Sequence, residues 1–147
     1  MKIQTKYHGE MTVEESTFFT FNNGLPGFID EKKYIIIPFS EDTPFFILQS
    51  VSTANVAFVM IEPFTYFNEY DFQLDDHIVE QLQLTSEKDV AVYNIITVQE
   101  PFDKTTINLQ APIVINANKR LGKQIILTNT PYHTKHALFE NKAQSVK

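Results

Sequence analysis

The chain has 147 residues, 43% of them hydrophobic, with 13 Phe and 6 Tyr, which is enough apolar material for the core of one domain. The absence of cysteine excludes disulfides and thiolate metal sites, and we find neither a secretory signal nor an apolar run that could cross a membrane. The net charge is −6, but residues 62–103 carry ten acids against one lysine. We therefore expect a cytoplasmic protein whose acidic middle does not bind nucleic acid directly, because such binding needs Lys and Arg.

The first half of the chain predicts short strands separated by turns. Apolar residues alternate with polar ones on both sides of His8–Gly9, which indicates a hairpin. Pro26 and Gly27 suit a type II turn, because Pro fixes φ at the first central position and Gly accepts a positive φ at the second. The further strands predicted here cover residues 18–21, 34–37, 45–51 and 56–61.

The second half predicts more strands and one short helix. Apolar and polar residues alternate over residues 70–75, which indicates a strand with one face in water. A helix is predicted near residues 76–84, with Asp75 or Asp76 as its N-cap. The strands that follow are predicted over residues 90–98, 105–116 and 124–127.

The spacing of these elements predicts the fold class. A parallel sheet would need crossover helices, and only one helical pattern is present. We therefore expect an all-β fold: a compact antiparallel barrel-like domain with one short helix, over residues 1–140. Residues 141–147 are expected to form a flexible C-terminal tail.

Two amides interrupt the predicted strand over residues 105–116. Asn108 and Gln110 would share one face of an extended strand. On this stretch alone we favour an internal network that holds neighbouring loops, because buried polar groups usually find partners inside the protein. The alternative is a polar surface offered to the backbone of another protein.

Motifs for catalysis and metal binding are missing from the sequence. Its four glycines form no phosphate-binding loop, and no serine lies in a nucleophile elbow. His133 and His136 are three residues apart, which is a weak metal motif because Pro131 precedes them and no acid stands beside them. A helix N-cap accounts for Asp75 and Asp76 without any acid–base role. We therefore expect no enzyme, no cofactor and no metal site.

Two segments carry a resemblance to a known family. They are Gly24-Leu25-Pro26-Gly27-Phe28 and Asn108-Leu109-Gln110-Ala111-Pro112-Ile113, accompanied in order by Leu48-Gln49-Ser50, Pro63, Tyr70, Gln124 and Tyr132. Together they resemble the pattern of FliW, the bacterial flagellar assembly factor family, over nearly the whole chain. Either segment alone is weak, whereas the two in this order are specific.

The resemblance implies a β-barrel-like fold and a non-catalytic regulator of translation. Proteins of the FliW family bind newly made cytoplasmic flagellin, and they also bind CsrA, a small dimeric RNA-binding protein that represses flagellin mRNA. Accumulating flagellin occupies FliW and frees CsrA, whereas flagellin export releases FliW to sequester CsrA again. The family further implies that two FliW chains flank one CsrA dimer at a site distinct from its RNA groove. We expect the chain to be a monomer when alone.

The charge distribution suggests how such a partner could lose its RNA. An acidic surface docked near a basic RNA groove would lower the positive potential that attracts phosphates. The residues that we expect to supply this field are Glu69, Asp71, Asp75 and Asp76. A merely solvated acidic face is the alternative.

Partner contacts are expected in the amide segment and in the basic C-terminal part. The predicted partner-binding residues are Asn108, Gln110, Tyr132, His133, Leu138 and Phe139. Aromatic anchors dominate binding energy, although Tyr132 would equally well pack on the barrel. The other functional class left open is a small-ligand-binding β-barrel, which would show an interior pocket with a few polar groups.

Overall fold

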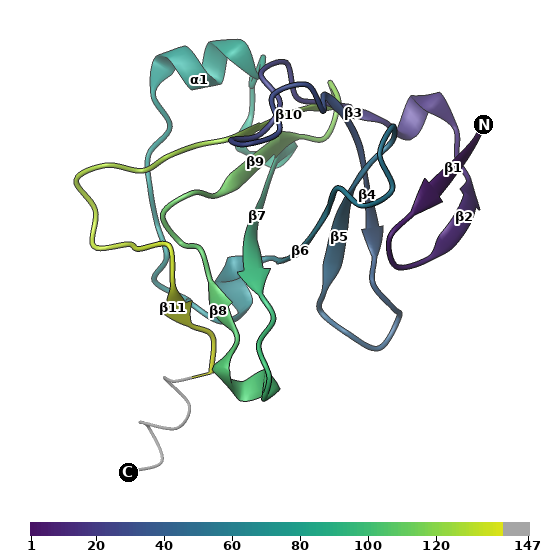
Figure 1. The fold of residues 1–147 in the computed structure, drawn as a ribbon. Coiled ribbons are helices and arrows are strands. Elements are labelled where there is room, and N and C mark those ends of the chain that lie inside the picture. The colour runs from purple at the N-terminus through teal and green to yellow at the C-terminus, as the bar shows by residue number, and fades with distance from the viewer. Residues whose placement is uncertain (140–147) are drawn as a thin grey trace.

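The computed structural model describes residues 1–139, which are built mainly of short strands (Figure 1). The tail predicted over residues 141–147 lies outside the described residues. Within residues 1–139 no helix is long and apolar enough to cross a membrane. The expected all-β, barrel-like fold with one short α-helix is confirmed.

The strands are β1 (Lys2–Thr5), β2 (Gly9–Thr12), β3 (Phe19–Thr20), β4 (Lys33–Pro38), β5 (Phe46–Ser50), β6 (Ala57–Ile61), β7 (Val90–Thr97), β8 (Thr106–Ile107), β9 (Ile113–Asn116), β10 (Leu121–Gln124) and β11 (His136–Ala137). The α-helix is α1 (Asp76–Gln81), and the 3-10 turns are η1 (Glu15–Thr17), η2 (Pro63–Thr65), η3 (Glu87–Asp89) and η4 (Phe102–Lys104).

Seven strands close into a barrel. Their order is β7-β6-β5-β4-β3-β10-β9, and β9 pairs back onto β7. All neighbours run antiparallel except β10 and β3, which are parallel and meet where Leu121 pairs with Thr20. Two short strands, β8 and β11, extend the sheet beyond β7.

β7 is the longest strand and joins the two parts of the sheet. Its sequence is rich in Val and Ile, which favour the pleated conformation. Residues 90–93 pair with β9, and residues 96–97 pair with β8. β6 pairs with β7 at two positions, through Met60 with Ile95 and Ile61 with Asn94.

The barrel interior is filled by side chains. The buried residues that pack together there are Phe19, Phe21, Leu25, Tyr34, Leu48, Met60, Ile113 and Ile115. All of them are at most 8% exposed. Because these large side chains occupy the interior, the pocket that a small-ligand-binding barrel requires is replaced by a packed core.

α1 covers the outer face of β9, above the barrel in Figure 1. Val114 points away from the interior and packs against Ile78 and Leu82 of the helix region. The helix ends at Gln81 rather than near residue 84, and Asp75 occupies the N-cap position without a side-chain cap hydrogen bond. Asp75 is therefore the N-cap residue, as one of the two predicted alternatives, but its side chain does not cap the helix.

Three predicted strands differ from the structure, and the one predicted over residues 124–127 lies three residues earlier, as β10 (Leu121–Gln124). Over residues 70–75, buried Tyr70 and partly buried Phe72 and Leu74 alternate with exposed residues, as the pattern indicates, but the segment is extended without a ladder partner. The single strand predicted over residues 105–116 is divided into β8 and β9 by a bulge at residues 108–112. Alternation reports burial on one side of an extended chain and does not require a neighbouring strand.

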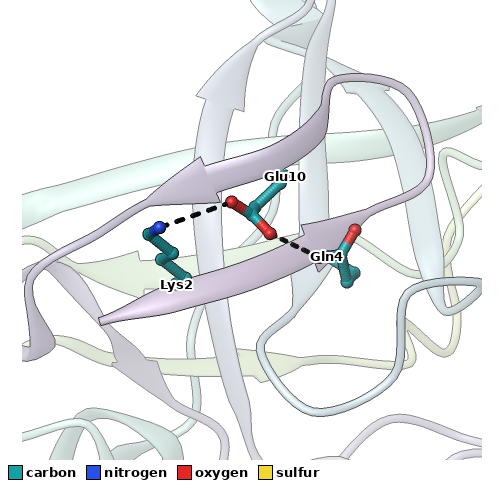
Figure 2. A network of polar contacts seen from close by, with 3 residues as sticks. All are labelled: Lys2, Gln4 and Glu10. Carbon is teal, nitrogen blue, oxygen red and sulfur yellow. Dashed lines mark hydrogen bonds and ion pairs between the residues drawn. The ribbon is translucent and has the colours of Figure 1, made fainter.

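The β1–β2 hairpin stands beside the barrel (Figure 1), and one of its faces is buried while the other is exposed. Ile3 is 4% exposed. On the opposite face the Glu10 carboxylate lies 3.8 Å from the Lys2 ammonium and accepts a 3.1 Å hydrogen bond from the Gln4 amide, as Figure 2 shows. The hairpin is tied to the barrel by the Lys6 N–H, which donates to the side chain of Gln49 at 3.0 Å.

Candidate protein-binding surface

The bulge at residues 108–112 arises where β8 and β9 pair with the same edge of β7. Tyr93 pairs with Ile113 and Ile96 pairs with Ile107, so residues 108–112 lie opposite only two residues of β7. The surplus residues leave the sheet and insert the Leu109 side chain, 2% exposed, into a second apolar cluster beside the barrel. The bulge thus brings a polar backbone next to an apolar core.

Every backbone group of the bulge has a partner within the chain. The N–H groups donate to the carbonyl oxygens of Ile95 and His133 and to the Asn108 side chain, and Pro112 has no N–H. The carbonyl oxygens accept from Asn94, Tyr70, Leu127, Gln124 and Ile125, in chain order. This complete pairing fixes the conformation of the bulge, since unpaired buried backbone groups are costly.

Asn108 closes the bulge upon itself. Its Oδ1 accepts from the backbone N–H groups of Gln110 and Ala111, each at 3.1 Å. Asn116, at the other end of β9, does the same with the N–H groups of Asn118 and Lys119. Asn108 therefore lies in the internal network, whereas a role of its side chain in partner binding stays a prediction.

Tyr70 and Asn94 support the bulge from below. The Tyr70 hydroxyl donates to the Leu109 carbonyl at 2.6 Å, and Asn94 Nδ2 donates to the Asn108 carbonyl at 2.8 Å and to the Tyr70 hydroxyl at 3.2 Å. Burial raises the pKa of Tyr70 to about 12, with the hydrogen bond from Asn94 acting in the opposite direction. The hydroxyl thus stays protonated and keeps its donor role at neutral pH.

Tyr132 and His133 contact the bulge and the segment at Tyr70 and Asp71. The His133 carbonyl accepts from the N–H groups of Leu109 and Gln110, each at 3.1 Å. The Tyr132 ring meets the Tyr70 ring edge-on at 4.7 Å, and its hydroxyl accepts from the Asp71 N–H at 3.1 Å. Tyr132 thus has the packed position that the sequence left as one alternative, and it remains partly exposed.

The two histidines of the weak metal motif are stacked on each other. Their ring centroids are 5.2 Å apart, and His136 Nε2 accepts the His133 backbone N–H at 2.7 Å. Burial, and then the neighbouring His133, lower the pKa of His136. One ring nitrogen of His136 is therefore used in a hydrogen bond that holds the backbone just before β11.

A groove runs along the outer face of β7 beside Tyr70. Its volume is about 560 Å³. It is lined by Phe64, Asp71, Phe72, Gln73, Leu74, Glu87, Val90 and Val92. Five of the eight lining residues are apolar, and both charged ones are acids, which suits a partner with apolar side chains and positive charge.

The four acids singled out in the sequence are all exposed, and they lie on the segment that leads into α1. Asp71 lines the groove, and Asp75 lines a neighbouring hollow on the other side of the extended segment. Asp76 is the first residue of α1, and Glu69 directly precedes Tyr70. The structure therefore places these carboxylates along one continuous stretch of the chain that borders the bulge through Tyr132.

The last two predicted partner-binding residues lie in different environments. Leu138 is 4% exposed and belongs to the second apolar cluster. Phe139 is partly exposed and contacts the Phe102 ring at 5.4 Å. Leu138 thus serves the core in this structure, which the irregular sequence of the C-terminal part did not indicate.

The predicted tight turn forms at Pro26 and Gly27. The Phe28 N–H donates to the Leu25 carbonyl at 2.7 Å, and Gly27 has a φ of +83°. Leu25, at 2% exposed, anchors this turn in the barrel core.

Sequence reasoning missed Asn94 and Gln124 as residues that shape the surface. Asn94 lies inside an apolar strand, and Gln124 Nε2 donates to the Ala111 carbonyl at 3.1 Å. A fully buried amide within a Val- and Ile-rich strand is a signal that a backbone nearby needs a donor. The partner of that amide becomes known only when the bulge is placed beside the strand.

Comparisons with known proteins agree with this geometry. The family model described as FliW protein matches residues 2–138. The chain is similar to the flagellar assembly factor FliW of Geobacillus sp. (strain WCH70), with 61% identity over 142 residues that cover 97% of this chain and 98% of that protein. It is also similar to the flagellar assembly factor FliW of Bacillus subtilis (strain 168), with 45% identity over 138 residues and coverage of 94% and 96%. A crystal structure of the flagellar assembly factor FliW matches with a TM-score of 0.90 at 57% identity, covering 94% of this chain and 96% of that one.

Proposed function

Because the chain belongs to the FliW family of flagellar assembly factors, we propose that it binds the translational repressor CsrA and is in turn sequestered by cytoplasmic flagellin. In this role it is a non-catalytic regulator that relieves repression of flagellin mRNA. The observation that carries the proposal is the similarity over nearly the whole chain, at 61% identity to one relative and 57% identity to a solved structure. Two chains per CsrA dimer are part of the proposal.

The acidic groove supports the CsrA half of the proposal. An RNA-binding protein presents Lys and Arg to phosphates, and its positive potential extends over about 10 Å at 0.1 M salt. Asp71 and Glu87 line the groove together with five apolar residues, and Asp75 and Asp76 follow Asp71 in the chain. Apolar contacts would hold the partner, while the carboxylates lower its potential and expel RNA without covering the RNA groove.

Size-exclusion chromatography of the purified protein with CsrA and with flagellin, singly and together, tests the proposal. We expect a complex with each partner, and release of CsrA when flagellin is added. A wild-type protein that comigrates with neither partner would refute the proposed function.

The electrostatic mechanism is tested by neutralising Asp71, Asp75 and Asp76 to Asn. We expect CsrA docking to be largely retained and RNA release to weaken, and we expect added salt to blunt the wild-type effect. The matched control neutralises Glu14, Glu15 and Glu41 to Gln, three exposed acids outside the groove. If the Asn variant expels RNA as well as wild type at low and moderate salt, a steric or conformational change within CsrA is the better account.

A further inference from the structure

A second hollow lies where the tips of three hairpins meet. Its volume is about 270 Å³, and its lining is apolar throughout. The lining residues are Tyr7, Phe39, Phe45, Val59, Ile96, Val98 and Phe102. They come from the β1–β2 turn, from the β4–β5 and β7–β8 loops and from strands β6 and β7. This hollow shares no lining residue with the acidic groove.

The rim of this hollow exposes large apolar side chains. Tyr7 is 43% exposed, Phe39 41%, Val98 52% and Phe102 44%. Isolated exposed apolar residues are common, whereas four of them gathered around one hollow are typical of a surface that contacts another protein.

The rings around the hollow hold each other in place. Tyr7 and Phe39 meet edge-on at 5.9 Å, and so do Phe45 and Phe102. The His8 ring nitrogen Nε2 lies 2.9 Å from the Phe39 carbonyl and links two of the hairpins. Because these aromatic side chains are already ordered, a partner that binds them loses little additional conformational freedom.

The loops that carry the hollow hold more acids than bases. Their acids are Glu41, Asp42, Glu100 and Asp103, and their bases are Lys6 and Lys104. A complementary segment therefore presents large apolar side chains to the hollow and basic residues to its rim.

We propose that this hairpin-tip hollow binds an apolar, base-flanked segment of flagellin before its assembly, and that it is separate from the acidic groove that faces CsrA. The inference rests on the proposed function. A subunit destined for a polymer has apolar contact surfaces that stay uncovered until it is assembled, and an assembly factor is suited to cover such a surface. The two surfaces share β7, which contributes Val90 and Val92 to the groove and Ile96 to the hollow, so binding at one can weaken binding at the other. Because they have no residue in common, each partner still depends on its own set of residues.

The test compares Val98→Asp with Ile29→Asp. Val98 lies on the rim at 52% exposed, whereas Ile29 is 67% exposed and lies outside the hollow, so both changes add one charge at an exposed aliphatic position. We expect Val98→Asp to weaken flagellin binding at least about tenfold, the effect of a moderate hot-spot residue, and to leave CsrA binding within about twofold. Ile29→Asp should leave both affinities within about twofold of wild type.

A second matched pair guards against a folding defect. Phe39→Ser removes a rim ring that is 41% exposed, and Phe28→Ser removes a ring that is 39% exposed elsewhere on the surface. Only the first should weaken flagellin binding when both are compared by calorimetry and by thermal melting.

The outcomes separate the inference from the proposed function. If wild type binds flagellin and Val98→Asp binds it equally well, the hollow is not the flagellin site and the inference fails alone. Equal loss of CsrA and flagellin binding would show one shared surface and would also overturn it. A wild-type dimer that Val98→Asp dissociates would assign the hollow to a second copy of the chain instead. If wild type binds no flagellin, the proposed function fails and the inference fails with it.

Discussion

The bulge at residues 108–112 and the β1–β2 hairpin are both bordered by polar side-chain networks, but the two networks differ in exposure. In the bulge network Asn94 is 0% exposed and Tyr70 4%. In the hairpin network the Lys2 and Glu10 side chains are 71% and 54% exposed. Buried hydrogen bonds have no water to replace them, whereas exposed ion pairs exchange freely with solvent. Side-chain hydrogen bonds therefore fix the conformation of the bulge, whereas burial of its apolar face fixes the position of the hairpin.

Asn94→Ala should give the largest effect on this comparison. The Asn108 carbonyl and the Tyr70 hydroxyl both lose the donor that Asn94 Nδ2 supplies. We expect a loss of about 2–4 kcal/mol in the free energy of unfolding, because each unpaired buried group costs about 1–3 kcal/mol. Urea denaturation measures this loss, and a change below about 0.5 kcal/mol would show that water replaces the amide.

Asn108→Ala tests the same network from within the bulge. The N–H groups of Gln110 and Ala111 lose their shared acceptor, so we expect a loss of about 1–3 kcal/mol in stability. Thermal melting is combined with a pull-down of both partners. Wild-type stability with reduced partner binding would favour the binding-surface interpretation, and a change in neither measurement would discard both.

Tyr70→Phe should cost about 1 kcal/mol at neutral pH, since it removes the hydrogen bond to the Leu109 carbonyl. It should also change the alkaline limb of the stability curve. The folded pKa of Tyr70 is raised to about 12 from 10.0, so the unfolded chain releases its proton first and wild-type stability falls as pH rises from 10 towards 12. The stability of the variant should fall less steeply over this pH range. Some of the fall should remain, because the pKa of Tyr34 is also raised to about 12. An identical slope in both proteins would contradict this assignment.

Lys2→Ala should give the smallest effect, within about 0.5 kcal/mol of wild type, because exposed ion pairs contribute little. Its control is Ile3→Ala on the opposite face, where the side chain is 4% exposed and its loss should cost about 2–4 kcal/mol. Guanidinium is unsuitable here because it screens ion pairs, so urea denaturation is the measurement. A loss above about 1 kcal/mol for Lys2→Ala would mean that the hairpin also depends on its polar face.

Much of the fold follows from alternation and turn residues, and the bulge shows where that reasoning ends. Residues 105–116 are rich in Ile, Val and Thr and therefore predict one strand. Nothing in this segment shows that Tyr93 and Ile96 of β7 pair with residues on either side of the bulge. The extra residues of the bulge become apparent only when two strands are aligned in register, so the sequence of one strand alone does not predict them.

The candidate surface was only partly predictable for similar reasons. The acidic character of residues 62–103 is a matter of composition and was visible in the sequence. The burial of Leu138 depends on the pairing of β11 with β8, which brings the irregular C-terminal part onto the second apolar cluster. Such long-range placement has no periodic signal in a short segment.

The parallel contact between β3 and β10 has a consequence for how the chain is made. Thr20 lies near the beginning of the sequence and meets Leu121 near its end, so the ring of strands stays open until the ribosome has delivered β10. Closure over so long a separation is slow compared with hairpin formation, and it leaves strand edges uncovered in the meantime. The nascent protein therefore keeps an incomplete sheet until β10 has been synthesised, and it acquires its closed form only after that point.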